Sequence, residues 1–319
     1  MYPDLYYAFK SLFGIQIPML KNINSFGFFV TLSFFVAAWI FTYELKRKQK
    51  AGEFNYELNH LKIKILPSDT MPYATVIAAI TGIVGAKIFS IPQQWKSFLY
   101  HPLYTLFSGG GFVFFGGLIT ATFALWFYYK KKKINPIKMA DAISPALMAA
   151  YALGRLGCQV AGDGDWGIIN QSIKPYNWIP GWLWAYDYPH NILKTGVYIP
   201  GCDWENYCYH LPIPVYPAPL YETIITTIFL VVLWIVRKRF RIAGRIAALY
   251  LILTAIERFF IEEIRITMRY NIFGLQLTEA QAISIFFAAG GIVLYILAPK
   301  LKVNKTYLSG DDKPCINKG

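Results

Sequence analysis

Long apolar stretches are the feature of this sequence that most limits its fold. They are each about 20 residues long, which is the length that a helix needs to cross a lipid bilayer. Because 55% of the residues are hydrophobic and only 15% are charged, the composition does not fit a soluble domain of this length. The sequence predicts an all-α integral membrane protein with about seven transmembrane helices. Their expected ranges are 24–43, 73–91, 111–129, 140–157, 216–236, 246–264 and 279–298.

Lysine and arginine residues predict how these helices are oriented. Of the 31 in the chain, 21 fall in clusters that lie on one side of the membrane if the chain crosses it seven times. Basic residues are enriched in cytoplasmic loops. We therefore expect a single transmembrane domain over 1–319, with an external N-terminus and a basic cytoplasmic tail at 300–319. This placement explains the formal net charge of +13 without a nucleic-acid partner, for which the chain has no binding motif.

The longest connection between the expected helices, at 158–215, is rich in Trp, Tyr, Pro and Gly and is acidic on balance. Connections of this length usually have a function of their own, and we expect an external cap between helices four and five. Cys202 and Cys208 lie in this cap and form either a disulfide or a pair of free thiols. The aromatic segment 92–110 is expected to lie in the membrane interface.

Ionisable residues within apolar helices are costly and commonly mark a functional site. Those of this chain lie toward the external ends of the expected helices: Lys87, Arg155, Glu222, Glu257, Arg258, Glu262, Glu263 and Arg265. Arg258, Glu262 and Arg265 are spaced four and three residues apart, so we expect them on one helix face.

These charged residues have two interpretations. One is an internal ion-pair network, in which Glu262 pairs with Arg258 and Arg265. The other is an anionic ligand, because the four cations are expected to outnumber the carboxylates near them. Guanidinium groups bind phosphate well, since they offer paired donors and stay charged. A phospholipid headgroup is the phosphate most available at that depth.

The glycines and the potential metal ligands also allow more than one interpretation. Gly82 and Gly85 have the spacing of close helix packing, whereas Gly116 and Gly117 serve either packing or a ligand. The turn GDGDWG has too few acidic residues for a calcium loop, and the histidines are too scattered for a metal site. No metal or other cofactor is predicted.

Six motifs, in chain order, resemble those of the bacterial prolipoprotein diacylglyceryl transferase family. GRLGCQVAGDGDWG, at 154–167, is similar to the family signature G-R-[IL]-G-N-F-x-N-G-E-x-x-G, and GGGFVFFGGLIT to its Ser-Gly-Gly…His-Gly-Gly-Leu-Ile stretch. VYPAPLYE resembles His-Pro-x-Gln-Leu-Tyr-Glu, and ERFFIEEIR resembles Arg-x-x-x-Glu-x-x-Arg. NSFGFFV is similar to a Tyr-Gly near the first span, and GAKIF to a Gly-Ala-Arg stretch. The resemblance covers nearly the whole chain.

The resemblance implies an enzyme of the bacterial inner membrane. It would move the diacylglyceryl group of phosphatidylglycerol to the lipobox cysteine of a preprolipoprotein, so that a thioether forms and glycerol phosphate leaves. Arg155 and Arg258 would stabilise the phosphate, with Arg265 as a supporting cation. Asp163 is the first candidate for the base that accepts the thiol proton, and Glu262 is the second.

Further residues complete the substrate-binding set that the resemblance implies for phosphatidylglycerol. Lys87 and Glu222 belong to it through their place among the intramembrane charges. Gly116, Gly117 and Gly167 would make space for the headgroup and the incoming peptide.

The sequence also departs from the family pattern. Phe115 stands where many members have a histidine that has been proposed as a base, and Phe26 stands where many have tyrosine. Cys158 and Ala161 replace the two asparagines of the signature, and Asp163 replaces its glutamate with one extra residue before the tryptophan. A mechanism that depends on the histidine does not carry over. Cys158 is expected to be a packing residue, because the attacking sulfur belongs to the substrate protein.

An anion or lipid transporter is the alternative function, with the intramembrane arginines along an anion path. Transporters of this kind commonly contain two matching halves with interrupted helices, and the sequence has no such internal repeat. Another phospholipid enzyme, an alcohol phosphatidyltransferase, would have a spaced run of aspartates in a membrane helix, which this chain lacks.

Overall fold

The structure is a computed structural model that describes residues 1–54, 67–107, 113–272 and 274–301. The chain forms two compact units. Unit 1 contains Met1–Phe41 and the described residues from Ile143 onward, and unit 2 contains those of Thr42–Ala142. Part of the basic segment 44–64, the glycines at 109–111 and nearly all of the predicted cytoplasmic tail lie outside the described residues.

A helix occupies each of the seven ranges that the apolar stretches predict. These helices are α2 (Ser25–Lys50), α3 (Met71–Ser90), α6 (Phe114–Lys131), α7 (Pro136–Ala161), α9 (Ala218–Val236), α10 (Arg245–Ile261) and α11 (Glu279–Leu297). Within the described residues, four helical segments are long and apolar enough to cross a membrane: Ser25–Lys50, Pro67–Ser90, Ala218–Val236 and Glu279–Lys300. The protein is thus mostly helical and has membrane-spanning segments, while the number of seven crossings stays a prediction.

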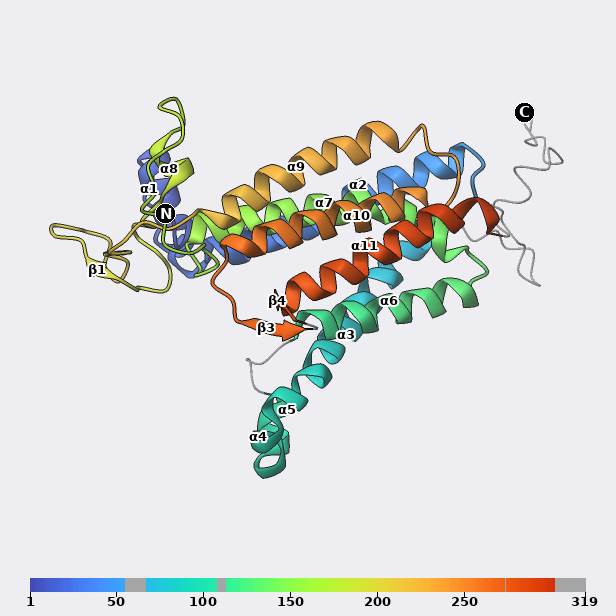
Figure 1. The fold of residues 1–319 in the computed structure, drawn as a ribbon, viewed down its shortest axis with the longest axis horizontal. Helices are drawn as coiled ribbons and strands as arrows, with labels where there is room; N and C mark the ends of the chain where they lie inside the picture. Colours follow the sequence, from blue (N-terminus) through green and yellow to red (C-terminus); the bar gives the residue numbers. More distant parts are fainter. Residues whose placement is uncertain (55–66, 108–112, 273, 302–319) are drawn as a thin grey trace. The chain divides into compact units, whose positions relative to one another are not determined.

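In unit 1, helices α7, α9, α10 and α11 run side by side (Figure 1). Met148 of α7, Leu233 of α9 and Ile246 of α10 are fully or almost fully buried and form a common core. Gly291 brings α11 close to α10, because a Cβ atom there would lie 3.0 Å from the Ala248 carbonyl oxygen. Many outward-facing residues of α9 and α11 are large and apolar, as a lipid environment requires.

In unit 2, helices α3 and α6 pack closely through small residues. A Cβ atom at Gly116 would lie 2.8 Å from the Gly85 carbonyl oxygen, and one at Gly117 would lie 2.7 Å from that of Gly82. The Thr120 hydroxyl donates a hydrogen bond to the Thr81 carbonyl oxygen at 2.8 Å. These contacts confirm the predicted packing role of Gly82 and Gly85 and give Gly116 and Gly117 the same role.

The segment predicted to lie in the membrane interface forms two short helices, α4 (Trp95–Tyr100) and α5 (Pro102–Phe107), within unit 2. Their exposed apolar residues include Leu99, Tyr100 and Leu103. Exposed apolar and aromatic side chains on short helices are typical of a membrane interface.

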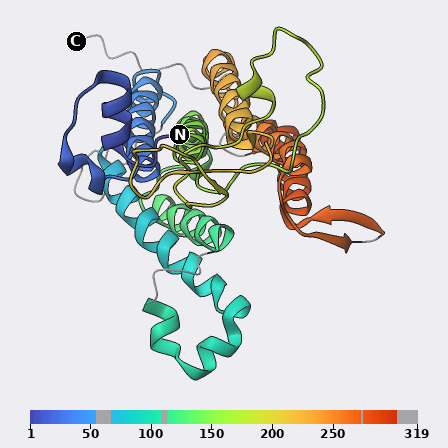
Figure 2. The same cartoon turned by 90° about the vertical axis from the view of Figure 1, so that its left-hand side faces the viewer.

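The expectation of an all-α chain was wrong in detail, because unit 1 also contains four short strands. β1 (Val197–Tyr198) pairs with β2 (Tyr209–His210), and β3 (Arg269–Ile272) pairs with β4 (Leu275–Thr278), both antiparallel. The second hairpin extends away from α10 and α11 (Figure 2). Its turn contains Gly274 with φ of +84°, a conformation that glycine adopts without strain.

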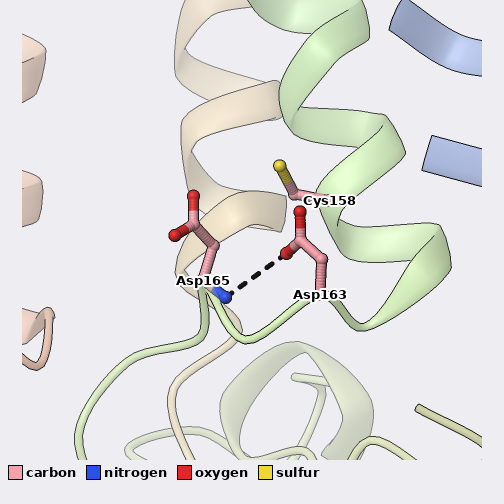
Figure 3. Close-up of side chains that lie close together, drawn as sticks. All are labelled: Cys158, Asp163 and Asp165. Atoms are coloured by element: carbon pink, nitrogen blue, oxygen red, sulfur yellow. Dashed lines mark hydrogen bonds between the residues drawn. The ribbon is translucent and has the colours of Figure 1, made fainter. Parts of the chain in front are cut away.

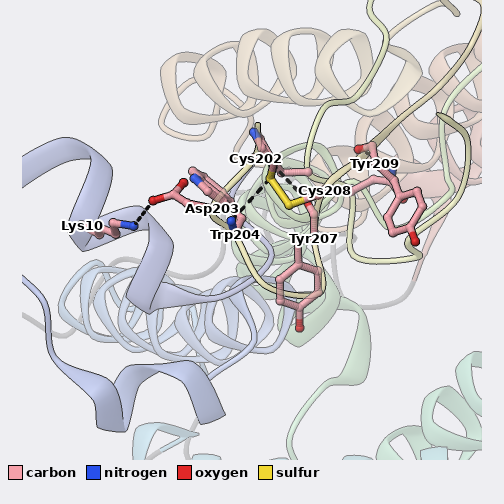
Figure 4. Close-up of a disulfide and its surroundings, with 9 residues drawn as sticks. Lys10, Cys202, Asp203, Trp204, Tyr207, Cys208 and Tyr209 are labelled. Atoms are coloured by element: carbon pink, nitrogen blue, oxygen red, sulfur yellow. Dashed lines mark hydrogen bonds and ion pairs between the residues drawn. A yellow bond between two sulfur atoms is a disulfide. The ribbon is translucent and has the colours of Figure 1, made fainter. Parts of the chain in front are cut away.

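The connection between α7 and α9 contains one short helix, α8 (Gly181–Trp184). A later part of this connection contacts the N-terminal helix α1 (Leu5–Phe13). The Tyr7 ring stacks on Trp204 with centroids 4.5 Å apart, and Lys10 forms an ion pair with Asp203 at 2.8 Å. Cys202 and Cys208 form a disulfide that closes the loop carrying these residues (Figure 4). The disulfide decides between the two states that the sequence allowed.

The disulfide predicts a stability effect. Replacing both Cys202 and Cys208 by serine is expected to destabilise the closed loop by about 2 kcal/mol, because the unfolded loop regains conformational freedom. Amide hydrogen exchange of residues 199–209 should therefore be faster in the double variant, and a reductant should have the same effect on the parent protein but none on the variant. Equal exchange in the two proteins would show that the bond contributes nothing to the stability of the loop.

Candidate functional site

The site begins where helix α7 ends. Gly162 has φ of +64°, and its N–H donates a hydrogen bond to the Cys158 carbonyl oxygen at 2.9 Å, which terminates the helix. Gly164 follows with φ of +98°. Two left-handed glycines in three residues turn the chain sharply back toward α7. The side chain of Asp165 therefore reaches Arg155, which lies in α7.

Gly167 fixes the next part of the chain between two other segments. Its N–H donates to the Tyr216 carbonyl oxygen at 2.8 Å, and the Ile168 N–H donates to the Ile264 carbonyl oxygen at 2.7 Å. A Cβ atom on Gly167 would lie 2.5 Å from that same Ile264 oxygen. We call residues 162–167 the signature turn. Only glycine therefore fits at its last position, where it meets the start of α9 and the end of α10.

These turns bring two arginines and two carboxylates together, and we call this set the arginine–carboxylate cluster: Arg155, Asp165, Glu222 and Arg265. Arg155 contacts Asp165 through Nη1 and Glu222 through Nε. Arg265 contacts Asp165 at 2.8 Å and Glu222 at 3.0 Å. Glu222 is fully buried. Each arginine thus bridges the same two carboxylates, which holds both guanidinium groups in a fixed geometry.

Asp165 stays ionised in this cluster. Burial by itself raises the pKa of the carboxyl, but the neighbouring Arg155 and Arg265 outweigh burial and hold the pKa below its ordinary value. Asp165 therefore positions the arginines as an anion and is a poor acceptor for a proton.

Arg258 forms a separate pair with Glu262, with 3.1 Å between Nη2 and Oε2. Helix α10 ends at Ile261 and continues as one 3₁₀ turn, Glu262–Ile264, before the chain becomes extended at Arg265. The expected common helix face of Arg258, Glu262 and Arg265 was therefore wrong, as was the pairing of Glu262 with Arg265. The end of the α-helix turns Arg265 toward Asp165 and Glu222 instead.

The expected excess of cations was also wrong for the arginines. Asp165 and Glu222 balance Arg155 and Arg265, and Glu262 balances Arg258. The sequence did not show that the turn after α7 places Asp165 against Arg155 of that helix. Among the described residues, the Arg258 Nη1 atom is buried and has no hydrogen-bond partner. This donor is the part of the set that an anion could bind without displacing a carboxylate.

Asp163 lies beside this cluster. Its carboxylate lies close to the Cys158 side chain, and the Asp165 N–H donates to Asp163 Oδ1 at 3.3 Å (Figure 3). Cys158 is buried. Ligand atoms of Cys158, Asp163 and Asp165 lie within 4.8 Å of one another, but Asp165 already bridges two arginines. We therefore interpret Cys158 and Asp163 as neighbours of the arginine–carboxylate cluster, and we do not interpret the three residues as a metal centre.

Three of the expected substrate-binding residues, Lys87, Gly116 and Gly117, belong to unit 2. Lys87 is buried within α3. The arginines and carboxylates all belong to unit 1. The grouping of these three residues with the arginines, and their role toward a headgroup, stay predictions.

Sequence reasoning missed two residues of the site, Asp165 and Tyr151. Asp165 lies in the signature turn that had been singled out, but only Asp163 was assigned to the site. Tyr151 precedes Arg155 by four residues and so lies on the same helix face. Its ring centroid is 5.5 Å from the guanidinium carbon of Arg155, and its hydroxyl contacts Glu222 at 3.2 Å. The helical spacing from Arg155 was the available signal.

Fold and site together define a class of protein. The chain is a mostly helical membrane protein in which arginines and carboxylates are held together at the ends of apolar helices, an arrangement typical of a functional site for a charged ligand. The family model for prolipoprotein diacylglyceryl transferase matches residues 13–297. The chain belongs to this family of enzymes.

Named relatives agree with the family. The chain is 30% identical over 296 residues to phosphatidylglycerol–prolipoprotein diacylglyceryl transferase 2 of Clostridium perfringens, covering 92% of this chain and 95% of the relative. It is 28% identical over 252 residues to the transferase of Lactobacillus johnsonii, covering 78% of this chain and 82% of the relative. The transferase of Clostridioides difficile is 28% identical over 244 residues, covering 76% and 84%. A transporter finds no support among these relatives.

Proposed function

We propose that this protein transfers the diacylglyceryl group of phosphatidylglycerol to the lipobox cysteine of preprolipoproteins, with the arginines of unit 1 at the phosphate. The observation that carries the proposal is the placement of Arg155 and Arg265 across two shared carboxylates, within a chain of this family. Phosphatidylglycerol and prolipoproteins are the molecules that the names of the relatives give.

The reaction is a displacement at carbon. The cysteine sulfur forms a bond to the terminal glycerol carbon of the diacylglyceryl group, and the bond from that carbon to the phosphate oxygen breaks. The electron pair of the broken bond leaves with glycerol phosphate, and the thiol proton passes to a base. Two groups thus need help: the leaving phosphate, whose charge must be stabilised, and the thiol, which must become a thiolate.

Arginines of unit 1 meet the first need. Arg155 and Arg258 are proposed to bind the phosphate, with Arg265 as a supporting cation. Because Asp165 and Glu222 fix Arg155 and Arg265 before the substrate arrives, little reorganisation is needed during the reaction, and preorganised charges act strongly where water is scarce. The Nη1 atom of Arg258 has no hydrogen-bond partner in the described ranges and supplies a donor for the incoming anion.

A carboxylate is proposed to meet the second need. A free thiol has a pKa of about 8.5, so only a few per cent is thiolate at neutral pH. Asp163 is the first candidate for the base, because its carboxylate lies beside the cluster and forms no ion pair among the described residues. Glu262 is the second candidate and is paired with Arg258. Phe115 cannot take this role, since its side chain has no titratable group.

Asp163→Asn tests the assignment of the base. The amide oxygen can still accept the Asp165 N–H, so the turn should fold, while turnover is expected to fall at least about 100-fold at neutral pH. The loss should become smaller as pH rises, because the substrate thiol then ionises without help. Turnover is measured with a lipobox peptide across a pH series. Unchanged turnover at neutral pH would remove Asp163 from the role, and Glu262→Gln would then be the variant to measure.

We further propose that the chain crosses the bacterial inner membrane seven times, with an external N-terminus and a cytoplasmic C-terminus. The distribution of lysines and arginines supports this topology. The Cys202–Cys208 disulfide supports it as well, because disulfides persist outside the cytoplasm. The connection between α7 and α9 would then form the external cap over the site, and the lipid would enter sideways between helices.

Complementation tests the proposed function in cells. The gene is expressed in bacteria depleted of their own diacylglyceryl transferase, and a reporter lipoprotein is analysed by mass spectrometry. We expect the reporter to gain a diacylglyceryl group and growth to be restored. A reporter that stays unmodified, although the protein is present in the membrane, would contradict the proposal.

A further inference from the structure

Glu257 is a carboxyl group that the proposed mechanism does not use. It lies in α10 and is 2% exposed. Among the described residues it forms no ion pair, and its Oε1 atom is buried without a hydrogen-bond partner. An ionised carboxylate in such a place would be costly, because a buried charge needs a counter-charge or several hydrogen bonds.

Within the part of the chain that the structure describes, the side chain of Glu257 has one hydrogen-bonding contact, with Tyr151. The Tyr151 hydroxyl oxygen lies 2.9 Å from Glu257 Oε2 and 3.2 Å from Glu222 Oε2. A tyrosine hydroxyl has only one proton to donate. If both carboxyl groups were ionised, one of the two contacts would bring oxygen lone pairs together without a proton between them.

Hydrogen-bond counting therefore assigns a proton to one of the two carboxyl groups. Glu222 forms ion pairs with Arg155 and Arg265, so it is the anion. We infer that Glu257 holds a proton and donates it in a hydrogen bond to the Tyr151 oxygen, while the Tyr151 hydroxyl donates to Glu222 and so positions the arginine–carboxylate cluster. Tyr151 and Glu257 are thus positioning residues that act through Glu222.

The charged groups around Glu257 come from three helices. Tyr151 and Arg155 face it from α7, Glu222 faces it from α9, and Arg258 is its neighbour in α10. While Glu257 is neutral, the full donation from Tyr151 to Glu222 weakens the hold of Glu222 on Arg155 and Arg265. If Glu257 loses its proton, Tyr151 donates to Glu257 instead, and Glu222 binds the two arginines more tightly.

The consequence for the substrate rests on the proposed function. A phosphate group must compete with Glu222 for the arginines, so loss of the Glu257 proton should weaken phosphatidylglycerol binding. We expect the KM for phosphatidylglycerol to rise about tenfold between neutral and alkaline pH, the size expected when a hydrogen bond to a charged group is redistributed. In Glu257→Gln, whose amide donates to Tyr151 but cannot ionise, this rise should disappear while kcat keeps its own pH dependence.

Infrared difference spectroscopy tests the proton directly and needs no turnover. The parent protein at neutral pH should show the C=O stretching band of a protonated carboxylic acid, and Glu257→Gln should lack it. Glu279→Gln is the matched control, because Glu279 is exposed at the start of α11 and should leave the band unchanged. If the band is absent from the parent, or persists in Glu257→Gln, the inference is overturned.

Tyr151→Phe provides a second variant with nearly the same shape. Removal of the hydroxyl should raise the KM for phosphatidylglycerol about tenfold already at neutral pH and leave the thermal unfolding temperature close to that of the parent. An unchanged KM would overturn the positioning role. A protein that shows the infrared band but transfers no diacylglyceryl group would contradict the proposed function and leave the assignment of the proton standing.

Discussion

Arg155→Lys is expected to lower the rate of diacylglyceryl transfer about 100-fold or more. Lysine keeps the charge but offers a single ammonium group, whereas Arg155 contacts both Asp165 and Glu222 through separate nitrogen atoms of a planar group. Lysine lacks the paired N–H donors of the guanidinium group, so its charge would no longer be held where the phosphate develops negative charge. Loss of one such preorganised donor typically lowers the rate about 100-fold or more. Transfer to a lipobox peptide is followed by mass spectrometry at saturating phosphatidylglycerol.

A matched arginine provides the control for this prediction. Arg269 also pairs with a carboxylate, Glu263 at 2.8 Å, but both side chains are about half exposed. Arg269→Lys should therefore change the transfer rate less than about twofold, as expected for an exposed ion pair. Similar rates for Arg155→Lys and Arg269→Lys would show that the fork geometry of Arg155 has no role in the reaction.

Gly167→Ala is expected to disrupt the site through a single added methyl group. The new Cβ atom would lie 2.5 Å from the Ile264 carbonyl oxygen and 2.9 Å from the Tyr216 Cβ atom. Neither neighbour is the flexible end of a side chain, so backbone must move, at a cost of about 1–3 kcal/mol in stability. The same movement would separate Asp165 from Arg265, and we expect the transfer rate to fall about 100-fold.

Gly181→Ala is the control for that methyl group. Gly181 begins α8 and no atom lies within 4 Å of the position that its Cβ would occupy. This variant should unfold at the same temperature as the parent and keep its transfer rate. If Gly167→Ala is as stable and as active as Gly181→Ala, the described packing of the signature turn cannot be what holds the cluster together.

Apolar stretches predicted the helices because the lengths of these stretches and their lack of charge leave few other structures open to the chain. Their ends were harder to predict. Helix α10 was expected to continue to 264, but it ends at Ile261, and the difference of one turn redirects Arg265. The β3–β4 hairpin was missed because it lies in the short connection between the predicted helices 246–264 and 279–298, for which no secondary structure was expected.

The candidate site was predicted in part. Arg155, Glu222 and Arg265 were singled out, because ionisable residues in apolar helices are conspicuous, and the structure brings them together. Their partner Asp165 was not, because its position depends on two left-handed glycines and on contacts with segments about 50 and 100 residues away. Such contacts between distant segments cannot be found from the local spacing of residues.

The most direct measurement follows both products of the reaction with purified protein in lipid nanodiscs. Phosphatidylglycerol and a lipobox peptide are supplied, and the diacylglyceryl-peptide thioether and the released glycerol phosphate are quantified together by mass spectrometry. We expect the two products in equal amounts, neither product from a peptide with serine in place of the lipobox cysteine, and the loss of both in Arg155→Ala. If folded protein that binds phosphatidylglycerol forms no thioether, or if Arg155→Ala is as active as the parent, diacylglyceryl transfer with Arg155 at the phosphate is contradicted.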